Sequence, residues 1–290
     1  TIRDLWKIYS RKKDLRISSS DVENEERVEE LDRGEDAVVA MKNVSLSVNS
    51  GETFIIMGLS GSGKSTLIRC LVRLVEPTSG EIIVDGQNVT AMRKRELVTF
   101  RREKIAMVFQ HYGLLPHRTV LENVCFGLKL RGEEKEDRRA KAAEALDRVG
   151  LKGWEKYYPA SLSGGMRQRV GIARALVMDP SILLMDEPFS GLDPLIRREL
   201  QDEMIRLQKE MHKTIFFVTH DLSEALRMGD RMAIMKKGEI VQIGSPDEVI
   251  ANPADEYVAK FVQDERDQVQ RAERALARER TRREAEVHVS

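Results

Sequence analysis

Residues 58–66 read Gly58-Leu59-Ser60-Gly61-Ser62-Gly63-Lys64-Ser65-Thr66, and this stretch decides the fold. It follows the apolar run Thr53–Met57 and opens the apolar run Leu67–Leu74, as expected of a glycine-rich turn between a strand and a helix. The glycines let several backbone N–H groups point at one place, where the helix N-terminus adds partial positive charge. We therefore predict a phosphate-binding loop, in which Lys64 reaches the β- and γ-phosphates of a nucleotide and Ser65 ligates Mg²⁺. The alternative is a plain Gly/Ser-rich turn, which leaves Lys64 without a purpose.

A second stretch carries two acids at the end of an apolar run. The residues from Ile182 to Met185 are apolar, and Asp186 and Glu187 follow them directly. In a nucleotide site, an Asp at this place holds Mg²⁺ through water, and the next acid polarises the attacking water as a general base. A strand that merely runs into a polar loop looks similar. The phosphate-loop pattern upstream favours the functional interpretation.

Composition narrows the class of protein. The 290 residues carry 48 basic and 48 acidic side chains, which argues against a protein that works mainly by binding nucleic acid. Hydrophobic residues make up 41%, enough for a sizeable core. No apolar run approaches the ~20 residues that span a bilayer, and no cleavable signal opens the chain. Cys70 and Cys125 suggest neither a disulfide framework nor a zinc site. We expect a soluble globular protein of a reducing compartment.

Short β-branched runs alternate with helical patterns, which is typical of an α/β domain. The predicted buried strands are Phe54–Met57, Glu81–Val84, Ile105–Phe109, Ile182–Met185, Thr214–Thr219 and Arg231–Met235. Helices are expected to follow Gly63, Ser163, Asp193 and Asp221. Between Thr119 and Val149 the pattern is helical and charged, so we predict an inserted helical subdomain there.

The two ends of the chain differ from this pattern. Thr1–Tyr9 is expected to be an edge strand. A polar surface excursion to about Asp36 follows, with Ser20-x-x-Glu23 as the capping box of a short acidic helix. From Asp264 onward the sequence is helix-prone and mixed in charge, which indicates a solvated helix or a frayed tail.

The segment Leu162-Ser163-Gly164-Gly165-Met166-Arg167-Gln168-Arg169 resembles the signature motif of ATP-binding cassette (ABC) proteins. The motif order resembles theirs as well: the phosphate loop, Gln110, the signature, Asp186-Glu187, Ser190–Asp193 and His220. The resemblance implies an α/β P-loop NTPase fold with a RecA-like core, an antiparallel β subdomain and an inserted helical subdomain. It implies a cassette over residues 1–263, with the helical subdomain at about 111–178 and an N-terminal insertion at about 10–36, followed by a charged tail over 264–290.

Longer segments are similar to the ATPase subunit of glycine betaine/proline importers, among them Ile105-Ala-Met-Val-Phe-Gln110-His111. The excursion between Tyr9 and Ala40 also resembles that family. The resemblance implies an ATP-hydrolysing subunit of a membrane importer for compatible solutes such as glycine betaine, proline betaine, choline or carnitine. It implies ATP and Mg²⁺, a second copy of the chain, an integral-membrane permease, and a periplasmic or surface substrate-binding protein that acts through the permease. It places the chain peripherally on the cytoplasmic face of the inner (cell) membrane, with no nucleic acid.

The same resemblance assigns roles to single residues. Two copies would pack head to tail, so that ATP is contacted in trans by Ser163, Gly164, Gly165, Met166 and Asp193. Met166 departs from the general pattern, where Gln is commonest, but betaine-type cassettes share it. The implied catalytic residues are Glu187, His220, Lys64 and Gln110, and the implied metal ligands are Ser65, Gln110 and Asp186. All residues of the stretch 58–66 would contact ATP. Tyr9 would stack on adenine; Trp6, on the opposite strand face, is the alternative, and a partly buried strand aromatic without function is a third interpretation.

Three questions stay open at this point. Residues His111–His117, with Tyr112, Leu114 and Leu115, either form a wall that receives a coupling helix of the permease or pack within the helical subdomain. A second class, ABC ATPases that act on nucleic acid or ribosomes, usually has two cassettes or a long insertion, and neither is present here. Relatives often carry regulatory CBS domains after the cassette, and the sequence ends at Ser290, too soon after Asn252 to contain them, so either the protein lacks them or the sequence is cut short.

Overall fold

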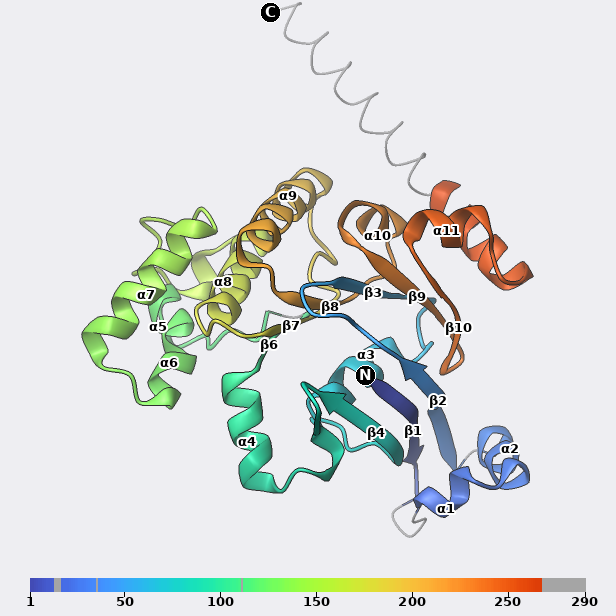
Figure 1. Cartoon of the computed structure of the whole chain (residues 1–290). Coiled ribbons are helices and arrows are strands. Elements are labelled where there is room, and N and C mark those ends of the chain that lie inside the picture. The colour runs from blue at the N-terminus through green and yellow to red at the C-terminus, as the bar shows by residue number, and fades with distance from the viewer. Residues whose placement is uncertain (13–16, 35, 111, 268–290) are drawn as a thin grey trace, which may run out of the picture.

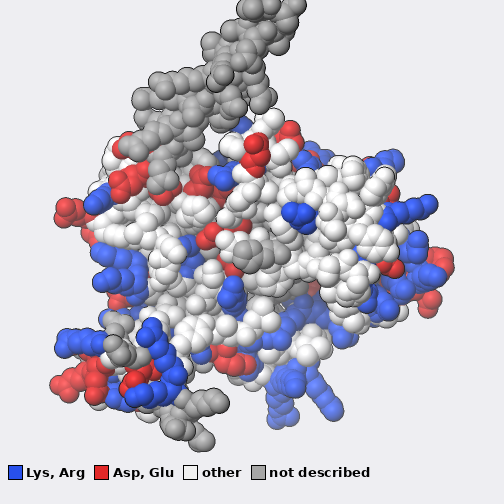
Figure 2. Space-filling model, turned by 180° about the vertical axis from the view of Figure 1, so that it is seen from behind, with Lys and Arg blue, Asp and Glu red and all other residues white. Residues whose placement is uncertain are grey.

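The computed structural model describes residues 1–12, 17–34, 36–110 and 112–267 (Figure 1). The predicted tail over 264–290 therefore lies outside the described residues after position 267, and so does His111. Two sheets organise the described chain. Figure 2 shows that side chains of both charges are spread over the back face, in keeping with the equal numbers of basic and acidic residues.

The larger sheet is six-stranded, in the order β10-β9-β3-β8-β7-β6. Neighbouring strands are parallel except for β10, which is antiparallel to β9. Every residue of β3 is buried, because helices cover both faces of a parallel sheet. The strands are β3 (Thr53–Met57), β6 (Ile105–Val108), β7 (Ile182–Asp186), β8 (Thr214–Val218), β9 (Arg231–Lys236) and β10 (Glu239–Gly244). Five of them match predicted strands; β10 was not predicted.

The smaller sheet has the order β2-β1-β4-β5 and is antiparallel. Its strands are β1 (Ile2–Ser10), β2 (Ala37–Leu46), β4 (Ser79–Val84) and β5 (Gln87–Asn88). The expectation of an edge strand at Thr1–Tyr9 is wrong, because β1 pairs with β2 on one side and with β4 on the other. The sequence did not reveal β2, since register shifts along the β1–β2 pair break the two-residue alternation that marks a strand.

Helices begin where the capping residues predict. Gly63, Ser163, Asp193 and Asp221 are the N-cap residues of α3, α8, α9 and α10. The bounds are α3 (Lys64–Leu71), α4 (Lys94–Glu103), α8 (Gly164–Leu176), α9 (Pro194–Met211), α10 (Leu222–Met228) and α11 (Pro246–Ala251), with a further helix over residues 256–267. Short 3₁₀ turns cover Val89–Ala91 and Pro159–Ser161. None of the helices within the described ranges is long and apolar enough to cross a bilayer.

The segment with no strand signal is helical: it contains α5 (Val120–Val124), α6 (Phe126–Arg131) and α7 (Lys135–Arg148). These helices gather with α8 at one side of the larger sheet, beyond β6 (Figure 1). They share one hydrophobic cluster with the facing side of that sheet, in which Val124, Leu146 and Val170 are fully or almost fully buried.

The N-terminal excursion forms α1 (Ser19–Val22) and α2 (Glu25–Arg33). The capping box lies at Ser18 and Asp21 instead of at Ser20 and Glu23, so that prediction is wrong by two residues. The reason is that Asn24 caps a second helix, which leaves room for only one turn before it. Leu31 of α2 is buried in a small cluster with residues of β1 and β2, so the excursion rests on the smaller sheet.

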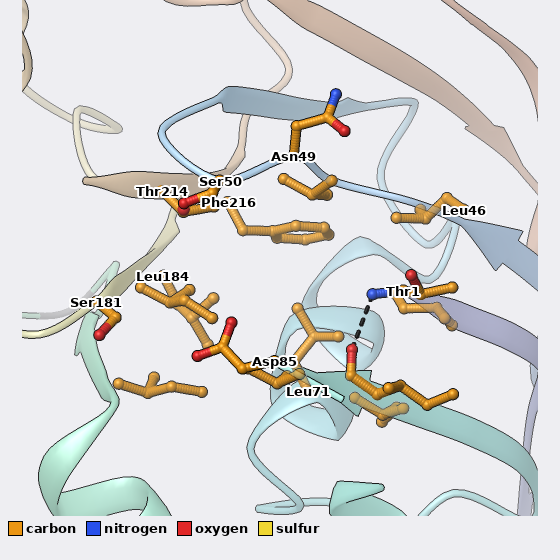
Figure 3. A pocket seen from close by; sticks show the side chains of 17 residues that line it. Thr1, Leu46, Asn49, Ser50, Leu71, Asp85, Ser181, Leu184, Thr214 and Phe216 are labelled. Atoms are coloured by element: carbon orange, nitrogen blue, oxygen red, sulfur yellow. Dashed lines mark hydrogen bonds between the residues drawn. The ribbon is translucent and has the colours of Figure 1, made fainter. Parts of the chain in front are cut away.

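A cavity of ≈ 300 Å³ lies between the two sheets (Figure 3). Its lining includes Thr1, Leu71, Ser181, Thr214 and Phe216. Ser181 precedes β7, and Thr214 begins β8, so the cavity opens at the amino ends of these strands. The phosphate-binding stretch lies at the carboxyl end of β3, on the opposite edge of the parallel sheet, so this cavity is not part of the site described next.

Candidate functional site

The loop that joins β3 to α3 curls tightly between two other strands. Gly58 has a φ of 150° and Gly63 has a φ of 103°, both in the region that favours glycine. A Cβ atom on Gly58 would lie 2.3 Å from the carbonyl oxygen of Met235, and one on Gly63 would lie 2.4 Å from that of Ala40. Both neighbours are backbone atoms of strands, which have little freedom to move away. The two glycines are therefore required by the shape of the loop.

Two polar groups of the loop are buried. Lys64 is 5% exposed, and its Nζ donates to the carbonyl oxygens of Gly58, at 2.7 Å, and Leu59, at 3.0 Å. Burial lowers the pKa of Lys64, and the nearby Glu187 and Asp186 oppose that shift. Ser62 is 4% exposed, and its hydroxyl has no hydrogen-bond partner among the described residues. Helix α3 also has no side-chain cap and no acid in its first turn. The loop thus brings buried donors together at a helix N-terminus that has no acid in its first turn, an arrangement that suits an anion.

Asp186 ends β7 directly beneath this loop. Asp186 is 2% exposed, and burial raises the pKa of its carboxylate. Ser65 Oγ donates to Asp186 Oδ1 at 3.1 Å, and Arg69 Nη2 lies 3.7 Å from Asp186 Oδ2. Ser65, Arg69 and Lys64 favour the charged form of this carboxylate, but burial outweighs them. The pair Ser65 and Asp186 is the kind of oxygen donor set that Mg²⁺ prefers.

Glu187 follows β7 and contacts one residue beyond β6 and one beyond β8. Gln110 Nε2 donates to Glu187 Oε2 at 3.2 Å, and His220 Nδ1 lies 3.4 Å from the same oxygen. The hydrogen bond from His220 lowers the pKa of Glu187, and the same contact raises the pKa of His220. Glu187 has a φ of 45°, a strained value for a non-glycine residue of the kind often found at functional sites. The carboxylate is therefore held ionised between an amide donor and an imidazole.

The signature residues lie on a different part of the molecule. Ser163 caps α8, and its Oγ accepts a hydrogen bond from Met166 N at 3.2 Å. A Cβ atom on Gly165 would lie 2.4 Å from Cγ2 of Ile196, so α8 and α9 pack closely there. Asp193 caps α9 by accepting from Leu195 N at 2.9 Å. Figure 1 shows α8 among the inserted helices, away from α3, so one copy of the chain does not bring Ser163 and Gly164 to its own phosphate loop.

The aromatic residues of β1 are partly exposed. Tyr9 is 37% exposed and pairs with Val38 of β2, and the Nζ of Lys7 lies 4.8 Å from the centroid of its ring. Trp6 is half-buried, and its carbonyl oxygen accepts from Thr78 N. The described residues show no hydrogen bond or ring contact that links either aromatic to the phosphate loop. Stacking on a base therefore stays a prediction for Tyr9.

The segment after Gln110 is attached to the signature helix. Arg174 donates to the carbonyl oxygens of Tyr112, at 2.8 Å, and Gly113, at 2.6 Å. The guanidinium of Arg167 lies 5.4 Å from the centroid of the Tyr112 ring, and Leu114 packs against the hydrophobic cluster of the helical subdomain. Of the two open interpretations, these contacts favour packing within the subdomain for Tyr112 and Leu114.

The sequence did not point to one buried group near His220. Glu224 on α10 is 3% exposed, and it accepts hydrogen bonds from Thr219 Oγ1 at 2.6 Å and from Gln201 Nε2 at 3.3 Å. Burial raises the pKa of Glu224 to about 7. The sequence pattern around Glu224 points to the wrong role. Asp221-x-x-Glu224 has the spacing of a capping box, in which the Glu would bond the N-cap backbone at the surface. Asp221 does cap α10, but Glu224 turns inward instead.

Glu224→Gln is expected to gain stability relative to the wild type as the pH rises. The native pKa of about 7 lies above the ordinary 4.5, so the folded state binds the proton more tightly than the unfolded chain does. Wild-type stability therefore falls as the pH rises through this window, by on the order of 3 kcal/mol, and a glutamine has no such loss. Urea unfolding of both proteins between about pH 5 and about pH 8 measures the difference. A difference that is flat with pH would contradict the shifted pKa.

Residues 41–190 match the family model described as ABC transporter, which is about half of the chain. The chain belongs to the ABC transporter family, and its α/β P-loop fold is that of an ATP-binding cassette. This confirms the predicted fold class.

The relatives narrow the class further. The chain is 58% identical over 228 residues to the glycine betaine transport ATP-binding protein OpuAA of Bacillus subtilis, a match that covers 79% of this chain and 54% of that protein. It is 56% identical over 223 residues to the glycine betaine/proline betaine transport system ATP-binding protein ProV of Escherichia coli, covering 77% and 56%. The chain thus spans about half the length of these curated relatives. The resemblance to the betaine-importer ATPases is confirmed.

A solved structure resembles the fold. The dimeric, post-hydrolysis structure of the ATP-binding cassette MJ0796, bound to ADP and Pi, superimposes with a TM-score of 0.71 at 34% identity. The match covers 84% of this chain and 97% of that one. It supports comparison of the two chains over most of their length.

Proposed function

We propose that this chain is the ATP-hydrolysing subunit of a membrane importer for compatible solutes such as glycine betaine, proline betaine, choline or carnitine. The observation that carries the hydrolytic part is the cluster of Gln110, Glu187 and His220 beside the phosphate loop. No residue of an ATPase subunit is expected to touch the solute. Support for the cargo therefore comes from the likeness to betaine-transport ATP-binding proteins.

ATP fits the donors of the phosphate loop. The unpartnered Ser62 hydroxyl, the buried Lys64 ammonium and the uncapped start of α3 belong to one loop and would serve the phosphates. The other members of the stretch, Gly58, Leu59, Ser60, Gly61, Gly63, Ser65 and Thr66, would line the same phosphates. Tyr9 would stack on the adenine.

Mg²⁺ fits the oxygen donors below the loop. Ser65, Asp186 and Gln110 are the residues that would hold it, with Asp186 acting through water. Support comes from the buried Asp186 carboxylate, whose pKa is raised by burial in spite of Arg69 and Lys64. When bound, the ion would neutralise part of the charge on the phosphates.

Glu187 is the residue we assign as general base. Its ionised carboxylate would accept the proton of the attacking water, while Gln110 and His220 hold the carboxylate in place. His220 is also free to turn toward the γ-phosphate, because its side chain is 57% exposed. Lys64 would stabilise the charge that develops on that phosphate.

Hydrolysis requires two copies in this proposal. Figure 1 shows α8 away from α3, so Ser163, Gly164, Gly165 and Met166 at the start of α8, together with Asp193, would complete the site of the partner copy. The cradle there is the Ser163 hydroxyl, the glycine N–H groups and the start of α8. ATP would join the copies head to tail and hydrolysis would separate them, which drives the permease. The domain division proposed is a cassette over 1–263, with the helical subdomain at about 111–178, the insertion at about 10–36 and a charged tail over 264–290.

A mixture of two defective variants tests whether the site is shared between copies. Lys64→Ala and Ser163→Ala are each expected to lower ATPase activity roughly 10-fold or more as single variants. In a mixed dimer, one site joins the altered phosphate loop of one copy to the altered signature of the other. The second site then has an unchanged phosphate loop and an unchanged signature. Activity in the mixture is therefore expected to exceed that of either variant alone. If the signature acted within its own chain, the mixture would show only the average of the two variants.

The transport role predicts defined partners. These are an integral-membrane permease, on whose cytoplasmic side the chain would sit peripherally, and a periplasmic or surface substrate-binding protein that acts through the permease, with no nucleic acid. A pull-down of the tagged native chain in mild detergent, followed by mass spectrometry, is expected to recover the permease. Stimulation of ATPase activity in the recovered complex by a panel of betaines would then name the cargo. Recovery of ribosomal or nucleic-acid-binding proteins alone would overturn the transport role.

A further inference from the structure

The turn that carries His220 is closed by one buried hydroxyl. Thr219 Oγ1 donates to Glu224 Oε2 at 2.6 Å and accepts from Asp221 N at 3.0 Å. Thr219 is almost fully buried, and its N–H donates to the carbonyl oxygen of Ile56 on β3. His220 lies between Thr219, which carries this hydroxyl, and Asp221, whose N–H donates to it. Its backbone is thereby held at both sides, while its side chain extends outward.

The same turn is joined to helix α9 by two contacts. Gln201 Nε2 donates to Glu224 Oε1 at 3.3 Å, and Arg197 Nη1 donates to Asp221 Oδ2 at 2.9 Å. Residues 197 and 201 are four apart, so both side chains leave the same face of α9. Helix α9 begins at its cap Asp193, which belongs to the proposed trans contacts. Glu224 therefore lies at the junction of the His220 turn and α9.

We propose that Glu224 is a positioning residue for His220: through the Thr219 hydroxyl it fixes the turn that carries the imidazole, and through Gln201 it ties that turn to α9. This inference rests on the proposed ATPase function, because His220 matters only if Glu187 is the base. Glu224 does not touch the nucleotide site itself. Its carboxylate is buried, and both of its oxygens are used in the two contacts.

The charges around Glu224 agree with such a role. Asp221 on its own helix raises the pKa of Glu224, and Arg197, Thr219 and Gln201 lower it, although burial is the largest cause and acts upward. His220 senses the same group, because the pKa of His220 is raised by Glu187 first and also by Glu224 and Glu265. Loss of the Glu224 charge is therefore expected to move the pKa of His220 downward. Displacement of the turn would also weaken the contact with Glu187 that is the main cause of the raised pKa, so the pKa of His220 reports where the imidazole lies.

Matched variants separate the hydroxyl and the carboxyl from simple packing. Thr219→Val keeps the shape and removes the hydroxyl, whereas Thr219→Ser keeps the hydroxyl. Glu224→Ala removes both contacts, whereas Glu224→Gln retains them if the amide of Gln201 turns over. We expect kcat for ATP to fall roughly 10-fold in Thr219→Val and Glu224→Ala, with the KM for ATP changed less than about 2-fold. Thr219→Ser, Glu224→Gln and the exposed control Glu256→Ala are expected to stay within about 3-fold of wild type.

A double-mutant cycle decides whether the effect passes through His220. In a His220→Ala background, Thr219→Val is expected to cost no further activity, because the side chain that it positions is gone. A second 10-fold loss in that background would overturn the proposal, as would an unchanged kcat in Thr219→Val or an unchanged pKa of His220, read by NMR, in that same variant. Wild-type protein that binds ATP but never hydrolyses it would instead overturn the proposed ATPase function, so the two failures are distinguishable.

Discussion

Glu187→Gln is expected to lower ATP turnover at least ~10²-fold while ATP still binds. The amide is nearly the same size as the carboxylate, and it can still contact Gln110 and His220, which lie 3.2 Å and 3.4 Å from Glu187 Oε2. An amide cannot take the proton of the attacking water. The phosphate loop and the signature are unchanged, so both copies should still close on ATP. Turnover is measured by phosphate release under saturating ATP.

The same variant should trap the closed state. Because separation of the copies follows hydrolysis in the proposed cycle, ATP-bound dimers of Glu187→Gln should accumulate and elute as dimers in gel filtration with ATP. Glu256→Gln, a change at an exposed glutamate on the last described helix, is the control and should behave as wild type. Wild-type turnover in Glu187→Gln would show that another group takes the proton.

The parts of the fold that follow from local chemistry could be predicted. Asp193 and Asp221 each precede a helix and accept hydrogen bonds from its first N–H groups, so the capping residue alone predicts where the helix begins. Strands buried on both faces, such as Thr214–Val218, appear as short apolar runs. The position of β1 could not be predicted in this way, because a central strand differs from an edge strand only by a partner that is distant in sequence.

The candidate site divides along the same line. The phosphate loop and the two acids at the end of β7 are contiguous motifs, and the structure brings Gln110, Glu187 and His220 together at neighbouring strand ends. Glu224 has no motif of its own. Its importance depends on Gln201, 23 positions away in sequence, and on a turn that points it inward. Spacing and periodicity in the sequence cannot predict the partner of a side chain when tertiary packing determines that partner.

Lys64→Ala is the second large effect, and we expect it to weaken ATP binding by roughly 10- to 100-fold. A charge-assisted hydrogen bond is worth about 1.5–3 kcal/mol, and each 1.4 kcal/mol is a factor of ten in affinity. In the described structure the Lys64 ammonium donates hydrogen bonds to the carbonyl oxygens of Gly58 and Leu59. Those carbonyls remain free to bond water in the variant, so the loss falls mainly on the bound phosphates. Titration of a fluorescent ATP analogue measures it.

Thermal stability separates this loss of binding from a loss of folding. Burial lowers the pKa of Lys64, which means that the charged side chain is costly to keep inside, so the variant without nucleotide should be about as stable as wild type or more stable. With ATP present, wild type should gain stability by mass action and Lys64→Ala should gain much less. The exposed Lys260→Ala serves as the matched control for loss of a lysine charge, with the full ATP-dependent gain expected. An unaltered gain in Lys64→Ala would refute the assignment of residues 58–66 as the phosphate loop, because no other buried ammonium faces that turn within the described residues.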